Sequence, residues 1–177
     1  NYINTNGVNG NLTFNVAAGY NETAPTGGYI IGGAGSALLS GPNSTSAART
    51  VSFIATNTQV TAPLQTAGSV IDGIFKLVGA DWITIQGFRL AEHGTPLTTA
   101  LATNNMTEWG IALLALSATD GAQNNTIQND TIVLSSTYNN SFGIYSNTRH
   151  AAATPATALT LTDATNGPNK SNKVYGC

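Results

Sequence analysis

Charged side chains are scarce in this chain. Its 177 residues include eight Asp or Glu and six Lys or Arg, so charged residues make up 8%, about a third of the usual share in soluble proteins. Three Lys and three Arg, scattered along a chain of net charge −2, form no basic stripe for phosphates. We therefore expect no nucleic acid partner. The same scarcity argues against a cleft that holds a strongly acidic polysaccharide.

Cysteine and long apolar runs are also missing. Cys177 is the one cysteine, so an internal disulfide cannot form. No apolar run approaches the roughly 20 residues of a membrane helix, and we expect no membrane insertion. The opening NYINTNGVNG lacks the basic and apolar regions of a signal peptide, and the final NKSNKVYGC stops in what reads as the start of a strand. We therefore expect a piece of a longer protein, truncated at both ends.

Helix signals are poor, and strand signals are plentiful. Asn, Thr, Gly and β-branched residues dominate, and no long stretch has apolar residues at helical spacing. Short alternating runs bounded by Gly, Asn, Asp or Pro predict strands instead. These runs are LTFNVAA (Leu12, Phe14, Val16), RTVSFIAT (Val51, Phe53), WITIQGFRL (Ile83, Ile85, Phe88, Leu90) and ALTLTD (Leu159, Leu161).

Two short phrases recur along the chain. Gly-Ile occurs at 73–74, 110–111 and 143–144, and Thr-Ile-Gln occurs at 84–86 and 126–128. Repeat periods of this length indicate a solenoid, a propeller or an array. A propeller would need hairpins, and no Asn-Gly or Asp-Gly turn stands between paired strands. In a parallel β-helix, by contrast, successive coils stack about 4.8 Å apart and each buries its Ile, Leu and Val on the coil before.

We therefore predict an all-β fold, a right-handed parallel β-helix, with a β-sandwich as the alternative. Residues 1–177 would form a single domain, with first coils at about 1–70 and repeat-like coils at about 71–177. Insertions such as EHGTPLTTALATNNMTE would leave the stack at its corners.

Three stretches carry a resemblance to a known family: GVNGNLTFNVAAGYNETAPTGGYIIGG, DGIFKLVGADWITIQGF and EWGIALL…NNTIQNDTIVL…GIYS. They resemble the pectate-lyase-like, right-handed parallel β-helix region of large secreted Bacteroidota surface proteins, which usually carry a sorting domain for type IX secretion. The resemblance implies a β-helix of several coils, secretion and attachment to the cell surface. It also implies a helical cap before the first strand and further coils after the last, and neither is evident here. It does not imply a reaction.

The densest polar cluster in the sequence is FRLAEHG, with Arg89, Glu92 and His93. Glu108 and Trp109 stand at the far end of the loop that follows. If the loop folds back, Glu92, His93 and Glu108 become candidate catalytic groups, with Trp109 and Arg89 as candidate sugar-binding groups. The alternative is that Trp109 begins the next strand and helps to close the core, while Glu92 and Arg89 form a surface pair of little energetic value.

Other polar residues have a structural explanation. Asp81 in GADW is expected to cap a bend, and the Asn clusters are expected to occupy corners, where Asn tolerates left-handed backbone and hydrogen-bonds along the stack. His150 reads as a loop residue without a functional role. Thr131, in Asp-Thr-Ile, resembles the O-glycan acceptor of that bacterial group. No carboxylate cluster indicates a metal, so calcium is possible but not indicated.

Two functions of different classes remain open. The first is a non-catalytic, secreted or surface-attached segment that serves as a stalk, an adhesin or a glycan-contacting module. Its partners would be glycans, and flanking coils or another chain at the exposed ends. The second is a carbohydrate-active enzyme, a lyase or a glycoside hydrolase, with its site in a groove on the β-helix. Glycoside hydrolysis needs two carboxylates across the scissile bond, and no Asp-Asp, Asp-x-Asp or Glu-x-x-His pattern occurs.

Overall fold

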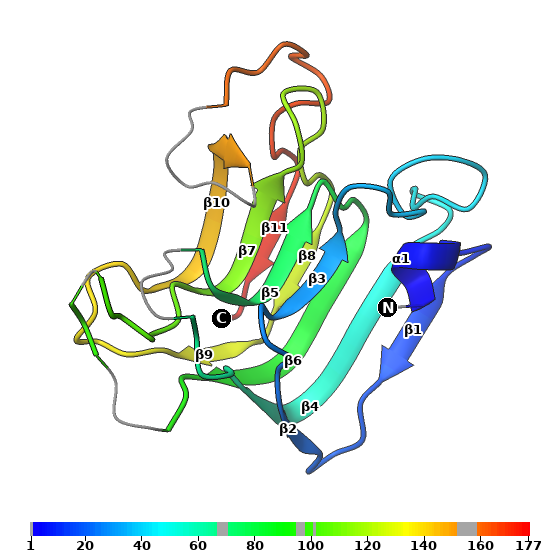
Figure 1. Cartoon of the computed structure of the whole chain (residues 1–177). Coiled ribbons are helices and arrows are strands. Elements are labelled where there is room, and N and C mark those ends of the chain that lie inside the picture. The colour runs from blue at the N-terminus through cyan, green and yellow to red at the C-terminus, as the bar shows by residue number, and fades with distance from the viewer. Residues whose placement is uncertain (1, 67–70, 95–97, 101, 152–158) are drawn as a thin grey trace.

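The computed structural model describes residues 2–66, 71–94, 98–100, 102–151 and 159–177. The chain is all-β with almost no helix, as predicted (Figure 1). No helix in the described part of the chain is long and apolar enough to cross a membrane. The elements in chain order are α1 (Tyr2–Asn6), β1 (Leu12–Asn15), β2 (Asn21–Thr23), β3 (Tyr29–Gly32), β4 (Val51–Thr61), β5 (Gly73–Val78), β6 (Ile83–Ala91), β7 (Trp109–Ala115), β8 (Thr126–Gln128), β9 (Thr131–Val133), β10 (Phe142–Ala151) and β11 (Lys173–Tyr175).

The strands form two sheets, and each pairing between named strands in the described residues is parallel. Sheet A has the order β1-β4-β6-β8-β11, with β2 also paired to β4 and β9 also paired to β6. Sheet B has the order β10-β7-β5-β3, and Figure 1 shows its strands side by side. Parallel neighbours need crossover connections rather than hairpins, whereas the sheets of a β-sandwich are antiparallel, so this topology argues against the β-sandwich alternative.

The chain visits the strands in a fixed order. The first half of β6 pairs with β8 and its second half pairs with β9, and β4 divides in the same way between β1 and β2. Sheet A therefore contains two files of short strands, and sheet B is a third file. The chain passes through the three files in the same order four times, at residues 12–32, 51–78, 83–115 and 126–151, and β11 returns to the first file. We call each passage a circuit.

The repeated phrases align across neighbouring circuits, with one exception. Thr84, Ile85 and Gln86 pair with Thr126, Ile127 and Gln128 in register, as the repeat predicts. Ile111 likewise pairs with Ile144. Gly73, however, pairs with Trp109, and Phe75 pairs with Ile111, so the first Gly-Ile is displaced by one residue. All residues of β5 and β7 are buried, which leaves no polar face in the sequence to reveal such a shift.

The main core contains residues from both sheets. Ile83, Ile85, Phe88 and Leu90 of β6 are all at most 4% exposed, as their alternation predicts. They pack in one cluster that also contains Ile74 and Ile111 of sheet B. Within it the rings of Phe75 and Phe88, one from each sheet, lie 5.5 Å apart. From Ile111 to Leu114, successive residues of β7 alternate between this cluster and a smaller one formed by Val78, Trp109, Ala112 and Leu114.

Three features of the fold differ from the sequence prediction. Residues 159–163, which include Leu159 and Leu161, contain no strand, and the chain turns at 164–166, where the Asp163 carboxylate accepts hydrogen bonds from Thr165 N (2.7 Å) and Asn166 N (2.9 Å). His150 lies within β10 rather than in a loop, and its side chain is outside the described part. The helix α1 was not expected; the Asn4 side chain holds it against β3 by donating to Ile30 O (2.9 Å) and accepting from Gly32 N (3.0 Å).

Two columns of left-handed residues mark the corners. Trp82, Asn124 and Ser171, with φ of 59°, 56° and 57°, stand just before the first-file segments of three consecutive circuits. A second column separates the first file from the second. It consists of Asn57, Gly87, Asn129 and Gly176, with φ of 51°, 76°, 55° and 69°. The expectation that Asn clusters occupy left-handed corners is therefore confirmed for NNTIQND, at Asn124 and Asn129. It is wrong for the cluster at the N-terminus, where Tyr2–Asn6 form α1.

Side-chain amides connect neighbouring circuits at the first corner. Asn125 accepts a hydrogen bond from Ile83 N (2.9 Å) and donates one to Ala80 O (2.8 Å). Asn172 repeats this pattern one circuit further, accepting from Asn125 N (2.9 Å) and donating to Ala122 O (2.9 Å). Each amide thus bonds to both ends of the equivalent four-residue corner, 80–83 or 122–125, of the preceding circuit. Side-chain amides of Asn therefore join segments that are neighbours in sheet A.

Candidate functional site

The loop after β6 returns to its starting point, as the site hypothesis requires. Glu92, just after β6, accepts hydrogen bonds from the hydroxyl of Thr107 (2.7 Å) and from its backbone N–H (3.2 Å). Thr107 also accepts a hydrogen bond from Gln65 (3.3 Å). Residues 95–97 and 101 of the loop lie outside the described part. Glu92 therefore lies beside the residue that precedes Glu108, and it clamps the base of the loop.

Glu108 is a buried carboxyl group at the start of sheet B. Its side chain is 1% exposed, and one oxygen accepts a hydrogen bond from the backbone N–H of Asp72 (3.0 Å). The carbonyl of Asp72 in turn accepts hydrogen bonds from the backbone N–H groups of Glu108 (3.1 Å) and Trp109 (2.9 Å). Burial raises the pKa of Glu108 to about 7, and the nearby Asp72 charge adds to the shift. Glu108 thus stabilises the junction between β5 and β7.

The other three candidate residues are Trp109, which is buried, and Arg89 and His93, which are half-buried. Trp109 is 3% exposed, and its ring stacks on Tyr145 with centroids 4.8 Å apart. The indole therefore packs against β10, which matches the alternative in which Trp109 begins a strand and closes a core. Arg89 donates to Gln59 on the neighbouring strand (3.3 Å). The backbone N–H of His93 donates to the Glu92 carboxylate (3.1 Å). None of these residues lines the large cavity described below.

Carboxylates at the corners, like that of Glu108, accept hydrogen bonds from backbone N–H groups. Asp81 accepts a hydrogen bond from Gln123 N (2.6 Å), which supports its predicted role at a bend. Asp130 accepts from Phe88 N (2.8 Å), and both of these bonds join neighbouring circuits. Burial raises the pKa of each group to about 6. In the described residues no group of three or more His, Cys, Asp or Glu side chains is placed to hold a metal ion. Thr131 is exposed at the start of β9, and its glycosylation stays a prediction.

These shifts predict that the fold is more stable in mild acid than at pH 8. The carboxyl pKa values of about 6 to 7 exceed those of the unfolded chain, about 4, so the folded state binds more protons. The stabilisation is complete below pH 4 and declines as the pH rises through 6 to 7. Summed over the three carboxyl groups, this linkage predicts that the free energy of unfolding falls by about 5 kcal/mol between pH 5 and pH 8. Urea unfolding at both pH values measures this.

Glu108→Gln is the matched variant for this pH dependence. The amide keeps an acceptor for Asp72 N but does not titrate, so the decline should shrink by roughly a third to a half. Burial lowers the pKa of Lys76, which gives a slope of opposite sign in alkaline solution, so the comparison ends at pH 8. A flat profile in the unaltered chain would contradict the prediction.

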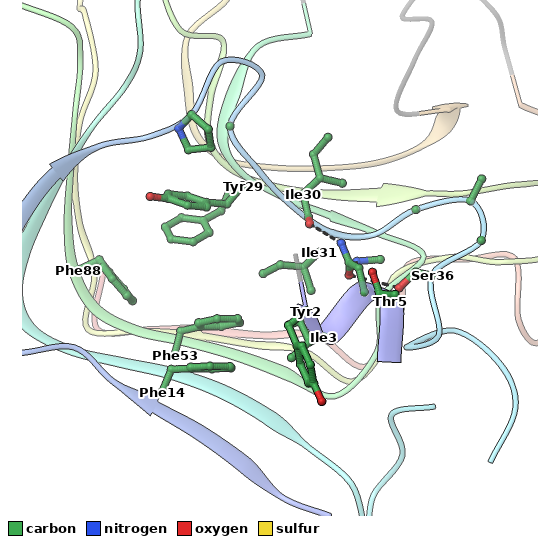
Figure 2. A pocket seen from close by; sticks show the side chains of 18 of the residues that line it. Tyr2, Ile3, Thr5, Phe14, Tyr29, Ile30, Ile31, Ser36, Phe53 and Phe88 are labelled. Carbon is green, nitrogen blue, oxygen red and sulfur yellow. Dashed lines mark hydrogen bonds between the residues drawn. The ribbon is translucent and has the colours of Figure 1, made fainter. Parts of the chain in front are cut away.

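A large cavity lies elsewhere, at the first circuit. Its volume is about 1120 Å³, and its walls come from α1, β1, β2, β3 and the adjoining parts of β4, β5 and β6. Figure 2 shows Phe14 and Phe53 together on one side of the space, Tyr29 on the opposite side and Phe88 at its edge. Phe14 stacks on Phe53 and Tyr29 stacks on Phe75, each with centroids 5.1 Å apart. Phe14 is 39% exposed, so the cavity opens to solvent.

Sequence reasoning missed this cavity. Its rings come from five separate strands and from α1, and no motif links them. The signal that could have found it is the alternation of LTFNVAA and RTVSFIAT, which places Phe14 and Phe53 on the same face once the strands are aligned. The facing pair, Tyr29 and Phe75, depends on the register of β3 with β5.

Comparisons of this chain with protein-family models, with curated proteins and with solved structures gave no match.

Proposed function

We propose that the chain is a segment of a right-handed parallel β-helix that acts without catalysis, as a secreted or surface-attached stalk, adhesin or glycan-contacting module. The fixed order of the three files and the amide bridges between circuits support the β-helix. The resemblance to the pectate-lyase-like region of Bacteroidota surface proteins supports secretion and attachment.

The observation that carries the non-catalytic function is the use of the carboxylates. Five of the eight acidic side chains accept hydrogen bonds from backbone N–H groups: Asp81, Glu92, Glu108, Asp130 and Asp163. Glu22 is held by the hydroxyls of Tyr20 and Tyr29. A catalytic pair must face substrate on both sides of the scissile bond. Carboxylates that hold corners and loops are poorly suited to that task.

The end of the two sheets opposite α1 is suited to pairing with further parallel strands. β10 and β11 are the last strands of the two sheets, and β9 is the last strand of the second file. Val133, Phe142, Val174 and Tyr175 on these strands are 45–52% exposed. Unpaired strand edges with apolar side chains favour pairing with further strands. The partner proposed there is a flanking coil or another chain.

One observation favours the enzyme as second candidate. A carboxyl group with a pKa near 7 suits general acid–base catalysis, and Glu108 has that pKa. The loop also folds back so that Glu92 accepts two hydrogen bonds from Thr107, the residue that precedes Glu108.

A polysaccharide panel distinguishes the two functions. We expect the chain to release no more reducing ends than its Glu108→Gln variant, because Glu108 is buried in a structural role. We also expect glycan-array binding, where it occurs, to be unaffected by this substitution. Turnover that Glu108→Gln abolishes, with unfolding by urea unchanged at pH 5, would establish the enzyme instead.

A further inference from the structure

The cavity at the first circuit combines aromatic rings with a single carboxylate. Four of its rings, those of Phe14, Phe53, Tyr29 and Phe88, are visible in Figure 2. Glu22 is the one charged residue among the described residues that line it, and none of those residues is basic. Rings present negative π faces, and the carboxylate adds a full negative charge in a partly desolvated wall. The lining is therefore complementary to a cation with an apolar body.

The polar groups of the lining are already engaged with one another. The side chain of Asn4 bonds to Ile30 O, Gly32 N and the hydroxyl of Ser36. The phenol groups of Tyr20 and Tyr29 both donate to Glu22. Burial and the Glu22 charge raise the pKa of Tyr29, so this hydroxyl keeps its proton and its bond. A sugar needs several free directional donors and acceptors, whereas a cation needs only the ring faces and the charge.

We propose that this cavity binds a small organic cation of the quaternary ammonium class. Recognition of such ligands by aromatic cages is a general use of cation–π attraction. The volume of about 1120 Å³ is ample for a trimethylammonium group with an attached chain. Phe14 and Tyr29, the outermost rings of the two stacks, contact the ligand, and Glu22 supplies the charge. The ligand enters past Tyr2, which is 77% exposed on α1.

Calorimetric titration of the full chain with choline tests the proposal. The matched neutral ligand is 3,3-dimethylbutan-1-ol, in which carbon replaces the charged nitrogen. We expect saturable choline binding, with the neutral isostere at least roughly tenfold weaker because it lacks the cation–π and carboxylate terms. Glu22→Gln should weaken choline binding about tenfold and leave the isostere unaffected. Phe14→Leu should weaken both.

The control variant is Phe142→Leu, which removes an exposed ring at the opposite edge of the fold and should leave the affinity unchanged. Thermal unfolding of each variant checks that it folds, and if Phe14→Leu does not fold, Glu22→Gln decides the question. Absence of choline binding overturns the proposal. Equal affinity for the isostere, or choline affinity unaffected by Glu22→Gln, also overturns it and leaves a merely apolar cavity. Saturable binding of a neutral disaccharide, together with no binding of choline, would assign the cavity to sugars.

Discussion

Gly87→Ala is expected to lower the free energy of unfolding by about 4 kcal/mol. Gly87 has φ of 76°, where an L-residue is strained by about 1–2 kcal/mol. A Cβ atom at this position would also overlap the carbonyl oxygen of Ala55 on the neighbouring circuit. Because that oxygen belongs to the backbone, relief requires the two circuits to move apart, and overpacking of this kind costs about 1–3 kcal/mol more. Urea unfolding followed by circular dichroism measures the loss.

Two further glycines separate the causes of this loss. Gly19 has the same φ of 76° but open space around its Cβ position, so Gly19→Ala should cost only the backbone strain, about 1 kcal/mol. Gly10 has open space and no left-handed backbone, so Gly10→Ala should change stability little. Equal losses for Gly87→Ala and Gly19→Ala would show that neighbouring circuits are not in close contact at the second corner.

Strands with one buried face could be predicted from the sequence. In WITIQGFRL the alternation of apolar and polar residues is interrupted once, at Gly87, and the structure changes partner strands at that residue. Thr-Ile-Gln repeated in register because Ile85 and Ile127 occupy equivalent core positions. Where equivalent core positions recur, the sequence itself repeats, and the repeat predicts the pairing.

Elements held by non-local hydrogen bonds could not be predicted, because no local sequence pattern marks them. β2 is the segment Asn-Glu-Thr, with no apolar residue, and it is a strand because it pairs with the second half of β4. The Asn21 side chain contributes by accepting from Gln59 N (3.1 Å). α1 is similarly fixed by Asn4, far from its partners in sequence. Local propensity contains no information on such contacts.

The candidate site shows the same limit. The sequence indicated that the loop between Glu92 and Glu108 could close, and it does close. It could not indicate that the carboxylates would bind backbone N–H groups, because those groups belong to other segments, such as Asp72. Nor could it place Trp109 against Tyr145, since that contact requires the pairing of β7 with β10. The hydrogen-bond partners and packing of the candidate residues therefore depend on strand registers that the sequence does not specify.

Asn125→Ala is expected to cost about 3 kcal/mol of unfolding free energy. The substitution removes the partners of Ile83 N and Ala80 O, and an unsatisfied buried group costs about 1–3 kcal/mol. Asn125 is itself 1% exposed, so water cannot replace the amide without opening the corner. Asn139→Ala, at an exposed position, is the control and should be nearly neutral. A loss below about 1 kcal/mol for Asn125→Ala would contradict a role for the amide in joining the circuits.

Asn125→Asp tests the direction of the two hydrogen bonds. A carboxylate still accepts from Ile83 N, but it places a negative oxygen against the carbonyl of Ala80, which the native amide satisfies as a donor. At pH 8 this variant should therefore be less stable than Asn125→Ala, because a charge is buried without a donor. In acid the protonated carboxyl can donate to Ala80 O, and the order of the two variants should reverse. Urea unfolding of both at pH 4.5 and pH 8 measures the reversal, and an unchanged order would mean that the Ala80 carbonyl does not depend on Asn125.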